Sequence, residues 1–183
     1  MLYQFELKTV GIIVGMALVL AHVVALLMMG PTQEFLKKLP RNKVLGVILI
    51  AVASIWAWWI IKTMDLGEFY ALREKILIVI PIAFCLVIFF ADEFLAVRAL
   101  GALALLAACV LLNAAWFKEP RTSILLPILA YAWIILGMFW VGMPYLLRDQ
   151  IDWVTQKAST WKLACASGIG FGLVLFGCAL AFY

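Results

Sequence analysis

The chain is built from long apolar stretches separated by short polar segments. From Ile76 to Phe117 only Asp92, Glu93, Arg98 and Asn113 interrupt an otherwise apolar run. About 20 residues of helix cross the hydrocarbon core of a bilayer, so a run of this length predicts two spanning helices. The two helices are expected to fold back on each other at the charged pair Asp92–Glu93.

The same pattern predicts six spanning helices along the whole chain. The apolar stretches are Thr9–Met29, Val44–Thr63, Ile76–Phe90, Phe94–Phe117, Ile124–Leu147 and Leu163–Phe182. Most reach the length of roughly 17–25 residues that a spanning helix needs. Ile76–Phe90 is shorter and is expected to borrow turns from Gly67–Lys75, so five spans are the alternative. Barrel strands alternate polar and apolar residues, and these stretches do not.

Composition agrees with this interpretation. Apolar residues make up 68% of the chain and charged residues 13%, whereas soluble domains are roughly half apolar. No connection is long enough for a soluble domain, which needs roughly 50 residues. We therefore expect residues 1–183 to form one all-α, polytopic transmembrane domain, folded as three successive hairpins. The first span is expected to be retained, because it is longer than a signal-peptide core and lacks a cleavage motif.

Basic residues concentrate in two of the predicted loops. Lys37, Lys38, Arg41 and Lys43 follow the first span, and Arg148, Lys157 and Lys162 follow the fifth. Six spans place both loops on one side, which the positive-inside rule makes cytoplasmic. We therefore expect both termini on the outer side of a cell membrane, taken as a bacterial-type inner membrane. The first cluster is expected to contact anionic lipid headgroups, at roughly 1 kcal/mol per basic residue.

The two basic loops are also expected to contain short helices. Gly30-Pro31 is predicted to close the first span, because glycine accepts a left-handed cap and proline cannot continue the helix. Thr32 is then expected to cap a short turn that ends before Pro40. In the second loop, Asp149–Trp161 is predicted to lie flat in the membrane interface. Tryptophans near the span ends, Trp116 and Trp161 among them, are expected to form anchoring belts.

Asp92, Glu93 and Arg98 form the main candidate polar site. In one interpretation Asp92 caps the fourth span, Glu93 lies at the positive helix end, and Arg98 reaches back toward the carboxylates or a lipid phosphate. In the other, a carboxylate faces a cavity as a proton or cation site, and Arg98 sets its pKa. Both interpretations remain open from the sequence.

Small residues predict where helices pack closely. Gly11 and Gly15 in the first span, and Gly168 and Gly172 in the last, are spaced four residues apart, as in Gly-x-x-x-Gly packing faces. The two strips could pair with each other, or the second with a copy of itself. His22 shares the face of Gly11 and is expected to hydrogen-bond across this seam. Asn113 is expected to bond to a neighbouring helix.

Catalytic, metal and cofactor motifs are absent from the sequence. There is no H-E-x-x-H, Walker loop or G-x-S-x-G elbow. The four cysteines fall inside spans without C-x-x-C spacing, so neither disulfides nor a metal cluster is expected. Haem binding through His22, the only histidine, needs a second ligand from Met or another subunit. We expect no enzyme activity, no metal, no cofactor and no nucleic-acid partner.

Three function classes remain. The chain is expected to be a non-catalytic subunit or accessory component of a larger membrane complex, or a homo-oligomer, because its faces are smooth and carry no chemical motif. The first alternative is a small oligomeric transporter or channel, with Asp92, Glu93 and Arg98 near one mouth and kinks at Pro81 and Pro127. The second alternative is a lipid- or cofactor-handling protein that uses the basic first loop.

Overall fold

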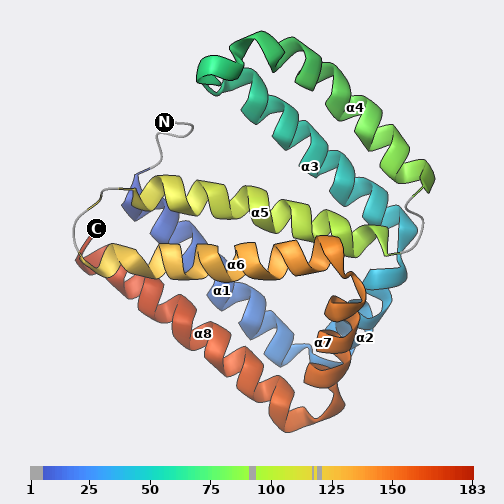
Figure 1. The fold of residues 1–183 in the computed structure, drawn as a ribbon. Helices are drawn as coiled ribbons and strands as arrows, with labels where there is room; N and C mark the ends of the chain where they lie inside the picture. The colour runs from blue at the N-terminus through green and yellow to red at the C-terminus, as the bar shows by residue number, and fades with distance from the viewer. Residues whose placement is uncertain (1–5, 91–93, 117, 119–120) are drawn as a thin grey trace.

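Every regular element that the structure describes is a helix. The computed structural model describes residues 6–90, 94–116, 118 and 121–183 (Figure 1). The α-helices are α1 Leu7–Leu27, α2 Met29–Lys38, α3 Lys43–Thr63, α4 Arg73–Phe90, α5 Leu95–Ala115, α6 Leu125–Gly142, α7 Tyr145–Gln156 and α8 Ala158–Ala181. Short 3-10 helices are η1 Leu39–Arg41, η2 Gly67–Leu72 and η3 Arg121–Ile124. The all-α prediction is confirmed for the described ranges, which contain no strand.

Within the described residues, five helical segments are long and apolar enough to cross a membrane. These segments are α1, α3, α5, Thr122–Gly142 (which contains α6) and α8, each 21 to 24 residues long. Their length and composition support a transmembrane protein. Helix α4 is not among the five, because Arg73, Glu74 and Lys75 occupy its first turn and leave Ile76–Phe90 as its apolar part.

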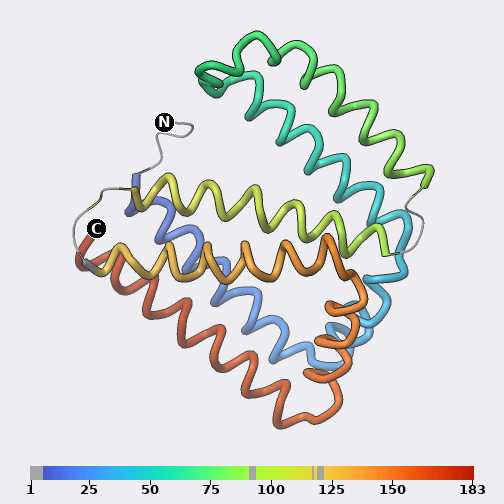
Figure 2. The backbone as a smooth tube through the Cα atoms, viewed as in Figure 1, coloured from blue at the N-terminus to red at the C-terminus, as the bar shows by residue number. Residues whose placement is uncertain are grey.

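Helices α1, α5, α6 and α8 form a four-helix core, and α3 and α4 form a hairpin on one side of it (Figures 1 and 2). Helix α1 packs against α8, and α5 packs against α6. Helix α3 packs on α5, whereas α4 packs on α3 and η2. The expectation of three successive hairpins is therefore wrong. The first and last helices pair with each other because their glycine-bearing faces allow a close approach.

The contact between α1 and α8 leaves no room for side chains at its centre. A Cβ atom on Gly15 would lie 2.9 Å from the backbone nitrogen of Phe176 and 3.0 Å from the carbonyl oxygen of Gly172. A Cβ atom on Gly172 would in turn lie 3.0 Å from the carbonyl oxygen of Gly15. Gly11 faces Ala179 and Tyr183 of the same partner segment. The two glycine strips thus face each other within one chain.

A second close contact joins α5 to α6. A Cβ atom on Gly101 would lie 2.7 Å from the carbonyl oxygen of Gly137, and one on Gly137 would lie 2.9 Å from that of Gly101. Gly46 makes a similar approach between α3 and α5, where an added Cβ would lie 2.8 Å from the backbone nitrogen of Ala96. Lipid tails are as apolar as leucine, so close packing of this kind drives helix association in a bilayer.

The first span ends earlier than its sequence suggests. Helix α1 stops at Leu27, and Met28 forms the break with φ −106° and ψ 50°. Gly30 and Pro31 lie inside α2, so the predicted left-handed cap at Gly30 is wrong. Proline fits there because backbone N–H groups in the first turn of a helix have no intrahelical partner. Thr32 is also helical, with its backbone N–H bonded to the carbonyl oxygen of Met28 at 3.0 Å, and is not a cap.

The second basic loop contains a helix with different bounds from those predicted. Helix α7 ends at Gln156, and Lys157, with φ −128° and ψ 137°, separates it from α8. Trp161 therefore belongs to the first turn of α8. Its side chain is buried, and the indole N–H donates to the carbonyl oxygen of Ala25 in α1 at 3.2 Å. The assignment of Trp161 to an interfacial belt is wrong, because this indole joins α1 to α8.

Candidate functional site

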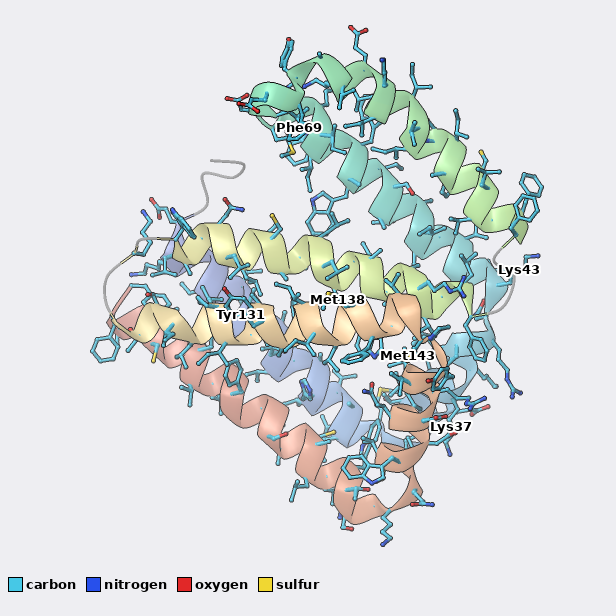
Figure 3. The ribbon with its side chains drawn as sticks, viewed as in Figure 1. Lys37, Lys43, Phe69, Tyr131, Met138 and Met143 are labelled. Atoms are coloured by element: carbon cyan, nitrogen blue, oxygen red, sulfur yellow. The ribbon has the colours of Figure 1, made fainter. Side chains whose placement is uncertain are left out.

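One end of the bundle gathers most of the basic loop residues. Helix α1 ends there, α3, α5 and α8 begin there, and α2 packs against α7 (Figure 1). Figure 3 shows Lys37 and Lys43 at this end and Phe69 at the opposite tip of the α3–α4 hairpin. We call it the basic end. The side chains predicted to meet lipid headgroups are all exposed: Lys37, Lys38, Arg41 and Lys43.

Lys38 is already paired with a carboxylate. Its Nζ donates to Glu34 Oε1 at 2.6 Å, one turn back along α2, and both side chains are exposed. This hydrogen bond, and then the charge of the ammonium group, hold the pKa of Glu34 below its usual range. Lys38 therefore contributes less to an anion site at the basic end than its sequence position suggests.

The acidic part of the main candidate site, Asp92 and Glu93, lies outside the described residues. Helix α5 begins at Leu95, and its N-cap residue is Phe94, with φ 57° in the left-handed region. Phe94 thus occupies the N-cap position that one interpretation assigned to Asp92. A left-handed conformation costs a non-glycine residue roughly 1 kcal/mol, which the chain accepts at the sharp reversal into α5.

Arg98 lies in the first turn of α5 and is half buried. Its Nε atom is buried and has no hydrogen-bond partner among the described residues. An unpaired buried donor is costly, and a guanidinium group carries five donors that match phosphate or carboxylate oxygens. Ala102, Leu105 and Cys109 follow Arg98 along the same face of α5, because these spacings return to nearly the same angle around a helix.

This face of α5 borders a groove beneath the hairpin. The groove has a volume of about 560 Å³ and lies between α3, α4 and α5. Small and aliphatic side chains line it, among them Ala53 and Ala57 of α3, Ala83 and Val87 of α4, and Ala102 and Leu105 of α5. Of the described side chains that line it, Ser54 alone carries a hydroxyl group. We call this space the hairpin groove.

A second groove lies on the other side of α3. It has a volume of about 470 Å³ between α1, α3, α5 and α6. The indoles of Trp56, Trp59 and Trp133 line it together with aliphatic residues such as Val10 and Leu111. Among the described residues that line it, Thr9 supplies the only hydroxyl group. Both grooves therefore match acyl chains or apolar helix faces, and neither offers the polar lining that an ion path needs.

His22 lies in the seam between α1 and α8. A Cβ atom on Gly168 would lie 2.3 Å from the imidazole ring, so the ring rests directly on the α8 backbone. The Nδ1 atom is 2.7 Å from the carbonyl oxygen of Leu18, one turn back in α1. The hydrogen bond expected across the seam is thus formed inside α1, and the glycine provides space for the ring.

Asn113 also bonds within its own helix. Its Nδ2 donates to the carbonyl oxygen of Cys109 at 2.9 Å and lies 3.5 Å from the Sγ atom of the same residue. The expected bond to a neighbouring helix is not among the bonds of the described residues. A side-chain amide in an apolar helix can satisfy its donors on the preceding turn, which removes the need for a partner.

Sequence reasoning missed the Gly101–Gly137 contact and the hairpin groove. Neither of the two glycines has a second glycine four residues away in its helix. The available signal was the glycine itself, since an isolated glycine inside a helix is unfavourable and usually has a packing reason. No local sequence pattern indicates the hairpin groove, because its existence depends on the distance between α4 and α5 in the folded chain.

No known protein family matches this chain, and neither does any curated protein or solved structure. Among residues 6–90, 94–116, 118 and 121–183, no three His, Cys, Asp or Glu side chains lie close enough to hold a metal ion. The function therefore has to be argued from the packing and from the two grooves.

Proposed function

We propose that the chain is a non-catalytic integral membrane protein and acts as a subunit or accessory component of a larger membrane complex. The α3–α4 hairpin supports this proposal. Helix α4 has no buried residue, and it packs on α3 and η2 rather than on the four-helix core. Figure 1 draws the tip of the hairpin away from α5. A hairpin attached along one edge is suited to receive helices from another subunit.

The proposal includes six membrane spans, with α4 as the sixth. Gly46 near the start of α3 touches Ala96 near the start of α5, so both helices enter from the basic end. The intervening segment must then return across the membrane, and α4 is the helix available for this. Its 18 residues extend about 27 Å, close to the 30 Å hydrocarbon core. Six spans place both termini on the side opposite the basic end, which we assign to the outer face of a cell membrane.

A lipid-handling role is the second candidate. The apolar hairpin groove and the half-buried Arg98 favour it, as do the exposed Lys37 and Arg41 at the basic end. The transporter or channel class receives less support, because the two grooves are lined almost entirely by apolar side chains.

Native mass spectrometry after purification from the source membrane in mild detergent tests the complex. We expect the chain to co-purify with at least one other polypeptide. A photo-cross-linking amino acid placed at Ile82 on α4 should capture that polypeptide. Leu173 on α8 is the matched control, because the two side chains are 53% and 55% exposed.

The expected result is cross-linking to protein at Ile82 and to lipid alone at Leu173. A chain that purifies by itself, with only lipid captured at both positions, would contradict the complex proposal. Protein captured at Leu173 and not at Ile82 would show that the hairpin is not the interface.

A further inference from the structure

We propose that the hairpin groove binds one anionic phospholipid, with its phosphate at Arg98 and an acyl chain between α3, α4 and α5. This inference goes beyond the proposed function, because a lipid bound to this chain is independent of any protein partner. It rests on the charge, the burial and the apolar lining that meet on one face of α5.

The guanidinium group supplies the anion contact. Arg98 is half buried in the first turn of α5, and its Nε donor is buried without a hydrogen-bond partner among the described residues. A phosphate diester carries one negative charge and accepts two parallel hydrogen bonds from a guanidinium group, a geometry that lysine cannot reproduce. A phosphate beside this side chain would bond to its terminal Nη groups, which are not among the buried atoms without a partner.

The groove supplies the site for the acyl chain. Ala102 lies one helical turn beyond Arg98 on the same face of α5 and lines the hairpin groove. Alanines from all three helices, Ala53, Ala83 and Ala102, keep the groove open over a volume of about 560 Å³. An apolar chain that enters from the level of Arg98 therefore meets an apolar lining along α5 as far as Cys109.

Neighbouring positive charge selects for an anionic headgroup. The segment η1 packs against the start of α5 and brings the exposed Arg41 to the same end. The contact of Gly46 with Ala96 also holds the first turn of α3, which carries the exposed Lys43, beside α5. Each basic residue near a membrane surface contributes roughly 1 kcal/mol of attraction to acidic lipids. Charge complementarity thus favours phosphatidylglycerol over the zwitterionic phosphatidylcholine.

Native mass spectrometry of the purified full chain tests the site. The detergent-solubilised protein is titrated with phosphatidylglycerol and, separately, with phosphatidylcholine of the same acyl chains. We expect tighter binding of phosphatidylglycerol to the wild type. Arg98→Gln should weaken this binding about tenfold or more, because it removes charge-assisted hydrogen bonds. Arg98→Lys should keep the preference for the anionic lipid at lower affinity.

Arg148→Gln is the matched control, because Arg148 lies toward the same end, is exposed and is paired with Asp149 at 2.9 Å. It removes the same charge and should leave lipid binding unchanged. Ala83→Phe tests the groove separately, since this exposed α4 position can fill the space without touching Arg98. It should weaken the binding of both lipids, and it still tests the proposal if Arg98→Gln does not fold.

Three results would overturn the proposal. Phosphatidylglycerol binding that is unchanged in Arg98→Gln would show that the guanidinium group does not contact the headgroup. An equal loss in Arg148→Gln would reduce the effect to general surface charge. Unchanged binding of both lipids in Ala83→Phe would show that the hairpin groove holds no acyl chain.

Discussion

At the scale of single residues, the absence of a side chain is the feature on which most helix contacts depend. Gly101 and Gly137 touch backbone to backbone, and a carbonyl oxygen cannot move aside as a side chain can. An added Cβ on Gly101 would lie 2.7 Å from the carbonyl oxygen of Gly137 and 3.1 Å from the backbone nitrogen of Val141. The helices must therefore separate to accept even one methyl group.

We expect Gly101→Ala to lower the free energy of unfolding by about 1–3 kcal/mol, the usual cost of overpacking. Gly177→Ala in α8 is the control, because an added Cβ there meets nothing within 4 Å. That change should stay within about 0.5 kcal/mol of wild type. Denaturant titration in detergent micelles measures both. Equal stabilities for the two variants would show that α5 and α6 do not pack through these glycines.

The contact between Gly168 and His22 should respond differently, because the clashing atoms belong to a movable ring. Gly168→Ala is expected to displace the imidazole and to break its bond to the carbonyl oxygen of Leu18. The double variant His22→Ala/Gly168→Ala should therefore lose less stability than the sum of the two single changes. A double-mutant cycle measures this coupling. Strict additivity would mean that the ring does not rest on Gly168.

Tyr183 ties the end of the chain to the start of the α6 segment. Its hydroxyl group donates to the carbonyl oxygen of Thr122 at 2.5 Å, and its ring packs near Gly11. We expect Tyr183→Phe to reduce the free energy of unfolding by about 0.5–1.5 kcal/mol at neutral pH. The measurement is thermal or denaturant unfolding of both proteins in the same detergent.

The same residue predicts a pH dependence. Burial raises the pKa of Tyr183 above its ordinary value. A raised pKa in the folded state means that the contribution is complete below the unfolded value of about 10 and is lost as pH rises through the folded one. The stability gap between wild type and Tyr183→Phe should therefore narrow above about pH 10. A gap that widens there would contradict the burial of this hydroxyl group.

Residue spacing in the sequence allowed only part of these helix contacts to be predicted. Gly11 and Gly15 share one helical face, as do Gly168 and Gly172, so both strips could be identified from spacing alone. Gly101 and Gly137 have no such partner in sequence, and their pairing depends on how α5 crosses α6. His22 and Asn113 were expected to bond between helices, but a carbonyl oxygen one turn back was available to each.

At the scale of elements, hydropathy placed the long apolar helices to within a few residues at most ends. The predicted Val44–Thr63 differs from α3 by one residue, and Ile76–Phe90 is the apolar part of α4. The wrong predictions concern residues whose chemistry is compatible with two different structures. Proline after glycine can follow the end of one helix or lie in the first turn of the next, and Pro31 lies in the first turn of α2. An indole near a span end can meet lipid or a neighbouring helix, and Trp161 meets α1.

Topology mapping tests α4 as the sixth span. Reporter domains that are active on only one side of the membrane can be fused after Glu68 in η2, after Lys157 and after Tyr183. We expect the fusions at Glu68 and Tyr183 to report the same side and the fusion at Lys157 the opposite side. A return across the membrane by α4 requires this pattern, because α3 and α5 both begin at the basic end. Five spans would put Glu68 and Tyr183 on opposite sides.

At the scale of the whole molecule, the chain divides into a four-helix core and an α3–α4 hairpin that packs on the core through α3. Residues buried in the core come from the two ends of the chain and from its middle, namely Val10 in α1, Leu175 in α8, Leu111 in α5 and Leu126 in α6. Hydropathy could not predict this order, because the long apolar helices carry apolar residues on all sides. In lipid, shape complementarity rather than polarity determines which faces meet.

This division predicts different mobility for the two parts. Helix α4 packs on α3 and η2, and the contact of α3 with the core that involves Gly46 lies near the start of that helix. The hairpin tip can therefore swing relative to the core. Spin labels at Phe69 and Tyr131, exposed 63% and 58%, should give a broad distance distribution in detergent. Labels at Leu27 and Leu163, exposed 78% and 74% on the tightly packed α1 and α8, should give a narrow one.

The same measurement distinguishes the causes that could hold the hairpin in place. If a partner subunit holds the hairpin in place, the distribution of Phe69–Tyr131 distances should narrow when the chain is purified within its complex. The distribution should then stay broad in the isolated chain, even with added phosphatidylglycerol. If the bound lipid is sufficient, phosphatidylglycerol should narrow it in the isolated wild type and fail to do so in Arg98→Gln. A distribution as narrow as that of α1 and α8 in the isolated, lipid-free chain would mean that the hairpin needs neither, which removes the structural basis of the proposed complex.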